Sequence, residues 1–478
     1  QGVFWAGTND GQVQVSQDGG KTWTNVTKNI PEFPALSTVR NIEASRWAEG
    51  KAYLTVEGHE VGNFQPYVYK TDNFGKTWKK ITKGIEGGNL NYCRMVKEDP
   101  VRKGLLFLGT ETKLYISFDD GENWQTFMSN LPASPMYWMD IPEHFNDLVV
   151  GTYGRGIWIL DDISPLQQIK DTNSKLSLFN PKDAYRFQGI TSTMQFFPEA
   201  SSGQDPPYGA SLNYWSAAEM DSVKIHITNA AGDTVRTIEG KAKPGINRVW
   251  WNLQSNPTKT VTMRTTPEGA DWFPMDKNRT RTNPNYGPLT YLVPPGTYNV
   301  HLVAGGQNLK APITIIKDPH SEGTLDDIKL QTDFVVKVTK DMNAIADMIN
   351  EMESIRRQLL DLGDVLAAQK KKDLAKDANE MSKKFAAIEG KLVQLKITGT
   401  GQDAVRWPAM LGEKFSYLGA TAATADFRPS DPHNEVYAKL KGELTAQQNA
   451  YDQLLKGDFA TFSKKLQDNG IGAIVMPK

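Results

Sequence analysis

One turn signature occurs three times in the first third of the chain, at residues 16–23, 71–78 and 117–124. The segments read SQDGGKTW, TDNFGKTW and SFDDGENW, with the shared pattern S/T-x-D/N-x-G-x-T/N-W. The hydroxyl and the carboxylate or amide can bond backbone amides in a tight turn, where the glycine permits a positive φ. Strand-like runs flank every copy, so each is predicted to be a β-hairpin tip. The pattern gives structural turn roles to Ser16, Asp18, Gly20, Trp23, Thr71, Asn73, Gly75, Trp78, Ser117, Asp119, Gly121 and Trp124.

The spacing of these turns, roughly 45 to 55 residues with strands on both sides, is typical of propeller blades of about four strands each. The signature resembles the Asp-box (BNR) repeat. Together with the segment VGTYGRGIWILDD at residues 150–162, it makes the chain similar to the bacterial sortilin-like (VPS10-like) propeller proteins, often labelled "glycosyl hydrolase". This resemblance implies a β-propeller and an extracytoplasmic location, and is specific for fold rather than chemistry.

The predicted propeller is incomplete. Residues 1–165 hold about three blades and a final strand, whereas a ring needs at least about four blades. The opening segment GVFWAGT reads as a strand in mid-blade. We therefore expect the C-terminal part of a longer propeller, with the remaining blades on another chain or an N-terminal fragment as its first partner.

A second β module is predicted at residues 176–318. Short alternating strands, such as VKIHIT at 223–228 and TVRTI at 234–238, indicate a small antiparallel sandwich. Its strand order resembles immunoglobulin-like or fibronectin-III-like modules. A long polar loop at 255–290 interrupts it, and we expect this loop to pack against the neighbouring propeller or, alternatively, to contact a partner or ligand.

Helical periodicity replaces the strand pattern over residues 324–470. Apolar residues follow a 3-4 spacing from Val335 to Leu362, and Gly363 is predicted to end this helix. Thr324 and Asp327 can form a capping box at its start. Three further helical stretches follow, so the region is predicted to be an antiparallel four-helix bundle.

Composition excludes several classes of function. The chain has 54 Lys and Arg against 55 Asp and Glu, without a long basic run, so no nucleic-acid partner is expected. No stretch reaches the roughly 18–20 apolar residues of a membrane span. The single cysteine, Cys93, excludes an internal disulfide; it is interpreted as a core thiol, with a reactive nucleophile as the alternative. The six histidines lack metal-ligand spacing, so no metal or other cofactor is predicted.

Two sets of residues could support hydrolase chemistry. A glycosidase needs two carboxyl groups facing a sugar cleft. Asp161 and Asp162 are candidates, with capping or a domain junction as the favoured interpretation and calcium binding as a further alternative. A sialidase-like site would need clustered arginines and a tyrosine nucleophile. Residues of those types are present without a local motif that joins them, at Arg40, Arg46, Arg94, Arg155, Tyr92 and Tyr153.

The favoured hypothesis is a non-catalytic scaffold that engages a protein, peptide or glycan, because no catalytic set is visible in the sequence. Ligand binding is assigned to Arg155, Tyr153, Trp138 and His59. The alternative is a glycoside hydrolase, or another hydrolase, whose active site is shared with the missing blades. Asp221-Ser-Val and Asp233-Thr-Val resemble O-glycan acceptor sites of Bacteroidetes envelope proteins, which fits an extracytoplasmic location.

Overall fold

The computed structural model describes residues 2–170, 174–189, 203–283, 286–400 and 405–476. Residues 171–173 lie outside this set, as do residues 284–285 of the predicted loop at 255–290. The chain divides into two compact units: Gln1–Phe179 with Asn213–Glu219 and Lys243–Arg248, and the remaining residues from Asn180 onward. The prediction of a mainly β chain with a C-terminal helical region is confirmed.

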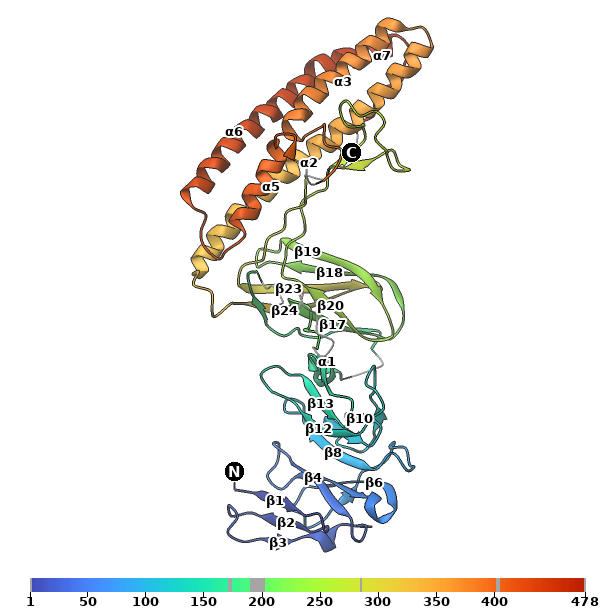
Figure 1. Ribbon diagram of the computed structural model, residues 1–478, viewed down its shortest axis with the longest axis vertical. Coiled ribbons are helices and arrows are strands. Elements are labelled where there is room, and N and C mark those ends of the chain that lie inside the picture. The colour runs from blue at the N-terminus through green and yellow to red at the C-terminus, as the bar shows by residue number, and fades with distance from the viewer. Residues whose placement is uncertain (1, 171–173, 190–202, 284–285, 401–404, 477–478) are drawn as a thin grey trace. The chain divides into compact units, whose positions relative to one another are not determined.

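Four antiparallel sheets follow one another in the first unit (Figure 1). The middle two have four strands, and the first and last have three. Neighbouring sheets pack through β1, β4, β8 and β12, as blades of a propeller do. The strands are β1 (Phe4–Gly7), β2 (Val13–Ser16), β3 (Thr24–Asn25), β4 (Thr38–Ala44), β5 (Ala52–Gly58), β6 (Asn63–Thr71), β7 (Lys79–Lys80), β8 (Cys93–Glu98), β9 (Leu106–Thr110), β10 (Leu114–Ser117), β11 (Gln125–Thr126), β12 (Met136–Asp140), β13 (Leu148–Thr152) and β14 (Ile157–Leu160).

The three repeated turns share one hydrogen-bond pattern. In the first, the Ser16 hydroxyl accepts the Gly20 amide at 2.8 Å, and Asp18 Oδ1 accepts the Thr22 amide at 2.9 Å. Thr71 with Asn73, and Ser117 with Asp119, repeat this arrangement. Hydrogen bonds from the Thr22 side chain and backbone lower the pKa of Asp18 to about 2. Each turn is therefore held by its own side chains.

Each Asp-box tryptophan packs on the preceding sheet where there is one. Trp124 of the third sheet donates through Nε1 to the carbonyl of Ile81, at the end of the second sheet, at 2.8 Å. Trp78 meets Trp5 of the first sheet edge to face, with ring centroids 5.8 Å apart. Trp78 and Trp124 are 7% and 5% exposed. Trp23, in the first sheet, is 44% exposed, and its indole N–H donates to the Gly20 carbonyl of its own turn. The motif thus fastens one blade to the blade before it.

Both terminal sheets of this series present apolar side chains to solvent. On the last sheet, the register places Trp138 opposite Gly151 and Gly151 opposite Ile157, so Trp138 and Ile157 share one face. Ile159 lies two residues further along the same face. Trp138, Ile157 and Ile159 are 63%, 74% and 58% exposed, and Phe4 of the first sheet is half exposed. Each of these faces is one that a neighbouring blade would cover.

The next segment of the chain forms three further sheets. They have the strand orders β15-β17-β20, β16-β24-β23-β18-β19 and β21-β22. β17 pairs antiparallel with β15, β18 with β19 and β23, β21 with β22, and β23 with β24, whereas β16 and β24 are parallel. The strands are β15 (Leu176–Leu178), β16 (Ala184–Arg186), β17 (Ala210–Ser216), β18 (Met220–Thr228), β19 (Thr234–Ala242), β20 (Gly245–Trp251), β21 (Thr262–Met263), β22 (Arg281–Thr282), β23 (Gly296–Ala304) and β24 (Gln307–Lys317).

The C-terminal helices pack around α2 (Leu325–Ala368), which contacts α3 (Lys372–Leu392) and α5 (Leu411–Ala422). α6 (Asp431–Leu454) packs on α3 and α5, and a π-helical turn at Leu455–Phe459 leads into α7 (Ala460–Asp468). Thr324 and Asp327 form the predicted capping box. The predicted end at Gly363 is wrong, because α2 continues through this buried glycine, which lies against Asn379. Among the described helices, none is both long enough and apolar enough to span a membrane.

The long loop of the second β module packs on α2. The Glu353 carboxylate of this helix accepts hydrogen bonds from the Arg264 amide and from both the amide and the hydroxyl of Thr265. Val261, Met263, Tyr286 and Leu289 of the loop belong to the same apolar core as the helices. The sequence-based prediction chose the propeller as the packing surface of this loop, but the structure places α2 there.

One glycine tests the junction between consecutive blades. Gly84 has φ of +95°, and a Cβ there would lie 2.1 Å from the carbonyl oxygen of Trp124. Gly84→Ala is expected to lower the free energy of unfolding by about 3 kcal/mol, because it combines backbone strain with a clash against main chain. Urea unfolding followed by tryptophan fluorescence measures this loss.

Gly87→Ala is the matched control, since no atom lies within 4 Å of its added Cβ and its φ is not positive. Its effect should stay within about 0.5 kcal/mol. Equal stabilities of the two variants would contradict the proposed junction.

Candidate functional site

The strand order separates the loops of the first unit into two groups. We call the first strand of each sheet, β4, β8 or β12, the innermost strand. In the second and third sheets, the connection between the second and third strands lies beside the start of the innermost strand. The Asp-box turn lies at the opposite end of the sheet. The last sheet has the same connection at residues 153–156, and the second and third have theirs at 59–62 and 111–113. His59, Tyr153 and Arg155 therefore belong to the end of the sheets remote from the Asp-boxes.

A β-bulge occurs at the same place in three successive innermost strands. In β4, Val39 pairs with Val56 and Asn41 with Thr55, which leaves Arg40 as the extra residue. The same shift leaves Arg94 unpaired in β8 and Tyr137 unpaired in β12. Bulges redirect side chains and are over-represented beside functional sites. Three equivalent positions therefore present two arginines and a tyrosine.

These redirected side chains meet. The Arg40 guanidinium carbon lies 4.4 Å from the centroid of the Tyr137 ring, and that of Arg94 lies 5.3 Å from it. Tyr153, from the 153–156 loop, lies with its ring centroid 6.0 Å from that of Tyr137 and is 73% exposed. We refer to Arg40, Arg94, Tyr137 and Tyr153 as the arginine–tyrosine cluster.

The two arginines of the cluster differ in their partners. Arg94 is buried and bonds Glu57 Oε2 at 3.0 Å and Glu111 Oε2 at 2.6 Å. Within the described ranges, Arg40 has neither an ion pair nor a hydrogen bond from its guanidinium, although it stacks on Tyr137. Arg94 is therefore a structural cation, whereas the donors of Arg40 are available to a ligand.

The four residues assigned to ligand binding from sequence are divided between two surfaces. Tyr153 joins the cluster, and Arg155 lies two residues further along the same exposed loop, with its carbonyl accepting Trp158 Nε1. His59 stacks on Tyr92 at 4.8 Å, and Tyr92 bonds Arg94. Trp138 instead lies on the exposed face of the last sheet, together with Ile157 and Ile159. Tyr137 was missed, because a bulge leaves no signal in a single sequence.

Several of the residues considered for hydrolysis have structural partners. Burial raises the pKa of Tyr92, which is unfavourable for a nucleophile, and its hydroxyl accepts from Arg94. Arg46 pairs with Glu143 at 2.6 Å. The carbonyls of Asp161 and Asp162 both accept from Arg248. Within the described part of the chain, no three His, Cys, Asp or Glu side chains converge as a metal site.

Side chains from the preceding blade occupy amides along the innermost strands. The Val96 amide donates to Asn41 Oδ1 at 3.1 Å, and the Glu98 amide donates to Glu43 Oε1 at 3.4 Å. In the next strand, the Met139 amide donates to the sulfur of Met95. Lys97 also lies 3.5 Å from Glu43 and 3.4 Å from Asp140. The three amide contacts use backbone donors that a strand added at this sheet edge would otherwise require.

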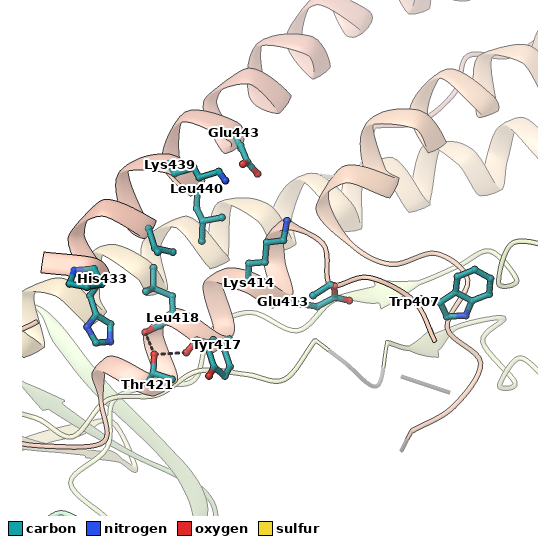
Figure 2. Close-up of a pocket in the computed structure, with 13 residues that line it drawn as sticks. Trp407, Glu413, Lys414, Tyr417, Leu418, Thr421, His433, Lys439, Leu440 and Glu443 are labelled. Carbon is teal, nitrogen blue, oxygen red and sulfur yellow. Dashed lines mark hydrogen bonds between the residues drawn. The ribbon is translucent and has the colours of Figure 1, made fainter. Parts of the chain in front are cut away.

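The helical region contains a separate groove between α5 and α6, shown in Figure 2, with a volume of about 760 Å³. Its floor includes Leu418 and Leu440, which are buried, while Tyr417 is largely exposed on its wall. Lys414, Lys439 and Glu443 also line it. Leu418 and Leu440 thus belong to the apolar core of the helices and also form the base of an open groove.

Comparison with known sequences gives one family model and one similar protein. The BNR/Asp-box repeat model matches residues 14–25. A 68-residue stretch is 38% identical to the vacuolar protein sorting/targeting protein 10 of Pyrenophora teres f. teres (strain 0-1). That stretch is 14% of this chain and 4% of the other protein, so the comparison covers a small part of each.

Comparison with solved structures gives distant likenesses. YCF48 bound to D1 peptide is 11% identical, with 65% of this chain and 78% of that chain covered and a TM-score of 0.26. The GH74 enzyme of Niastella koreensis is 12% identical, with 52% and 29% covered and a TM-score of 0.24. At these scores, neither the ligand nor the activity in those descriptions bears on the site described above.

The unequal partners of the two bulge arginines lead to a stability prediction. Arg94→Met should lower the free energy of unfolding by about 3 kcal/mol, because it leaves the buried carboxylate of Glu57 without its cation. Arg40→Met occupies the equivalent position and should cost at most about 1 kcal/mol, the loss of one cation–π contact. Urea unfolding compares the two, and equal losses would contradict the assignment of roles.

The Cys93 thiol leads to a second prediction. Its side chain is fully buried, and burial raises its pKa to about 12. A folded sample at pH 8 is expected to resist alkylation by iodoacetamide and to react fully in 6 M guanidinium, because the thiolate is the reactive form. Intact mass spectrometry detects the adduct, and rapid labelling of the folded protein would contradict the core-thiol interpretation.

Proposed function

We propose that this chain, a sortilin-like BNR-repeat β-propeller protein, is a non-catalytic binding scaffold. Its ligand contacts the end of the sheets that carries the loops 59–62, 111–113 and 153–156. The observation behind the proposal is the arginine–tyrosine cluster, where Arg40, Tyr137 and Tyr153 offer a guanidinium and two ring hydroxyls without partners among the described residues. Convergent polar groups among aromatic rings are typical of binding sites.

The carboxylates nearest the cluster favour binding over hydrolysis. Glu57 and Glu111 both bond Arg94, so neither is an unengaged acid and base pair of the kind that glycoside cleavage requires. The glycoside hydrolase alternative would have to draw its carboxyl groups from blades outside this chain.

The partner we propose for the open faces is a set of further propeller blades, on another chain or elsewhere in a longer protein. Trp23 and Phe4 are exposed on the first sheet, and Trp138, Ile157 and Ile159 on the last. The equivalent tryptophans Trp78 and Trp124 are buried by a neighbouring sheet, so added blades would bury these side chains in the same way. Covering a large apolar side chain stabilises by about 1.5–3 kcal/mol.

The location and the remaining modules are part of the same proposal. An extracytoplasmic or secretory-pathway location fits the similarity to a vacuolar sorting/targeting protein. We assign residues 176–318 to an immunoglobulin-like or fibronectin-III-like module and residues 324–470 to an antiparallel four-helix bundle, both serving to connect the propeller to a larger assembly. A protein or glycan is the expected partner.

Binding without turnover tests the scaffold function. The protein is applied to arrays of polysaccharides and synthetic peptides, and products of bound probes are analysed by mass spectrometry after prolonged incubation. We expect retention of a probe with no cleavage. Cleavage of a retained probe would contradict the scaffold function and favour the hydrolase.

The proposed blade partner has its own test. Native mass spectrometry of the protein isolated from its source should find a longer chain or a companion polypeptide with further Asp-box repeats. Ile157→Asp combined with Ile159→Asp should release a companion, or expose a continuous chain to limited proteolysis, because it places charge in a buried blade interface. Val101→Asp is the control, since Val101 is also exposed but lies in the turn after β8. Unchanged assembly in the double variant would contradict the proposal.

A further inference from the structure

Arg40 lies on an aromatic ring and keeps its hydrogen-bond donors unpaired. Its guanidinium carbon lies over the Tyr137 ring, 4.4 Å from the ring centroid, and no described residue accepts from its N–H groups. Guanidinium groups pair with carboxylates through two parallel hydrogen bonds, and stacking on an aromatic ring fixes the plane in advance. The side chain is partly exposed and has no carboxylate partner among the described residues. It is therefore a prepared receptor for one carboxylate.

Arg94 provides an internal comparison. It occupies the equivalent bulge in the next strand and lies 5.3 Å from the same ring, but Glu57 and Glu111 satisfy its guanidinium. Among the described residues, one of the two matched arginines is thus neutralised and the other has no carboxylate partner. This difference restricts the receptor to a single carboxylate rather than a polyanionic surface.

Aromatic rings and hydroxyls surround this receptor. Tyr153 is largely exposed, with its ring 6.0 Å from that of Tyr137 and tilted by 33°. A pyranose ring has an apolar face of C–H groups that stacks on the negative face of an aromatic ring, and its hydroxyls suit the tyrosine O–H groups. A sugar that carries a carboxylate combines both requirements.

An extended peptide fits the same surface less well. Peptides that add to a sheet edge gain affinity from main-chain hydrogen bonds. Beside the cluster, the amides of Val96, Glu98 and Met139 already donate to side chains of the preceding strand. Recognition there depends on side chains, which favours a carbohydrate.

From this arrangement we propose that Arg40, Tyr137 and Tyr153 bind a carboxylated sugar, such as a uronic or sialic acid residue of a glycan. This inference rests on the proposed binding function and names its ligand class. Arg40 receives the carboxylate, Tyr153 stacks on the pyranose ring, and the tyrosine hydroxyls bond sugar hydroxyls.

Titration calorimetry on the full chain tests the inference with four probes: polygalacturonate, a sialylated oligosaccharide, neutral dextran and polyglutamate. We expect binding of one or both carboxylated sugars and none of dextran. Arg40→Met should weaken that binding by at least about tenfold, the value of one charge-assisted hydrogen bond. Arg40→Lys should restore it only in part, because an ammonium lacks the planar fork. The uronate and sialate arms separate the two sources of the carboxylate.

Two further variants provide controls. Lys103→Met removes one positive charge from an exposed turn at the Asp-box end of the third sheet, where Gly104 bonds Asp120, and should leave the affinity unchanged. Tyr153→Ala should weaken binding, whereas Tyr153→Phe keeps the stacking face and should lose less. Equal losses for Arg40→Met and Lys103→Met would overturn the inference, since they would indicate attraction by net charge alone.

The outcomes also separate this inference from the scaffold function. Binding of polyglutamate with the same dependence on Arg40, and of neither sugar, would overturn the sugar assignment while a binding scaffold remains. Cleavage of a carboxylated sugar would overturn the scaffold function and leave the carboxylate receptor in place. Arg40-independent binding of all acidic probes would overturn the receptor.

Discussion

The packing of Trp78 and Trp124 on the preceding sheet is the constraint on which the first unit depends. The turn itself is local, held by a hydroxyl and a carboxylate or amide within a few residues. Its tryptophan, however, reaches across to the blade before it, as Trp124 does to the Ile81 carbonyl. Gly75 and Gly121 bring their turns so close to Val26 and Ile81 that added Cβ atoms would overlap these side chains. The repeat therefore sets the spacing between blades as well as the shape of each turn.

That spacing places the innermost strands of successive blades next to one another, and the position of the arginine–tyrosine cluster depends on it. Bulges at the same position in β4, β8 and β12 can place Arg40, Arg94 and Tyr137 together only because the blades repeat in register. Carboxylates from the connecting loop and the adjacent strand then satisfy Arg94 and leave Arg40 to solvent. Equivalent arginines in two blades therefore differ in role because of the charged residues beside them.

The features that could be predicted from the sequence are those encoded locally. The Asp-box turns depend on residues within eight positions of one another, and the helix start at Thr324 depends on a residue three positions away. The cluster depends on strand register, so Arg40 and Arg94 were noted only as residue types and Tyr137 was not found. Gly363 was expected to end α2, but packing against Asn379 outweighs the weak helix propensity of one glycine. The loop at 255–290 required knowledge of which helix lies beside it.

That loop has a consequence for how the chain can be divided. Val261, Met263, Tyr286 and Leu289 lie in the interior of the helical region, and Gly412 and Gly419 of α5 leave room for Tyr286 and Leu289. Helices excised at residue 324 would carry unfilled hollows at these positions and an unshielded apolar stripe along α2. The boundary suggested by the change from strands to helices is therefore a poor place to cut, and the second unit is expected to melt as one body, with its β-strands and helices losing structure together.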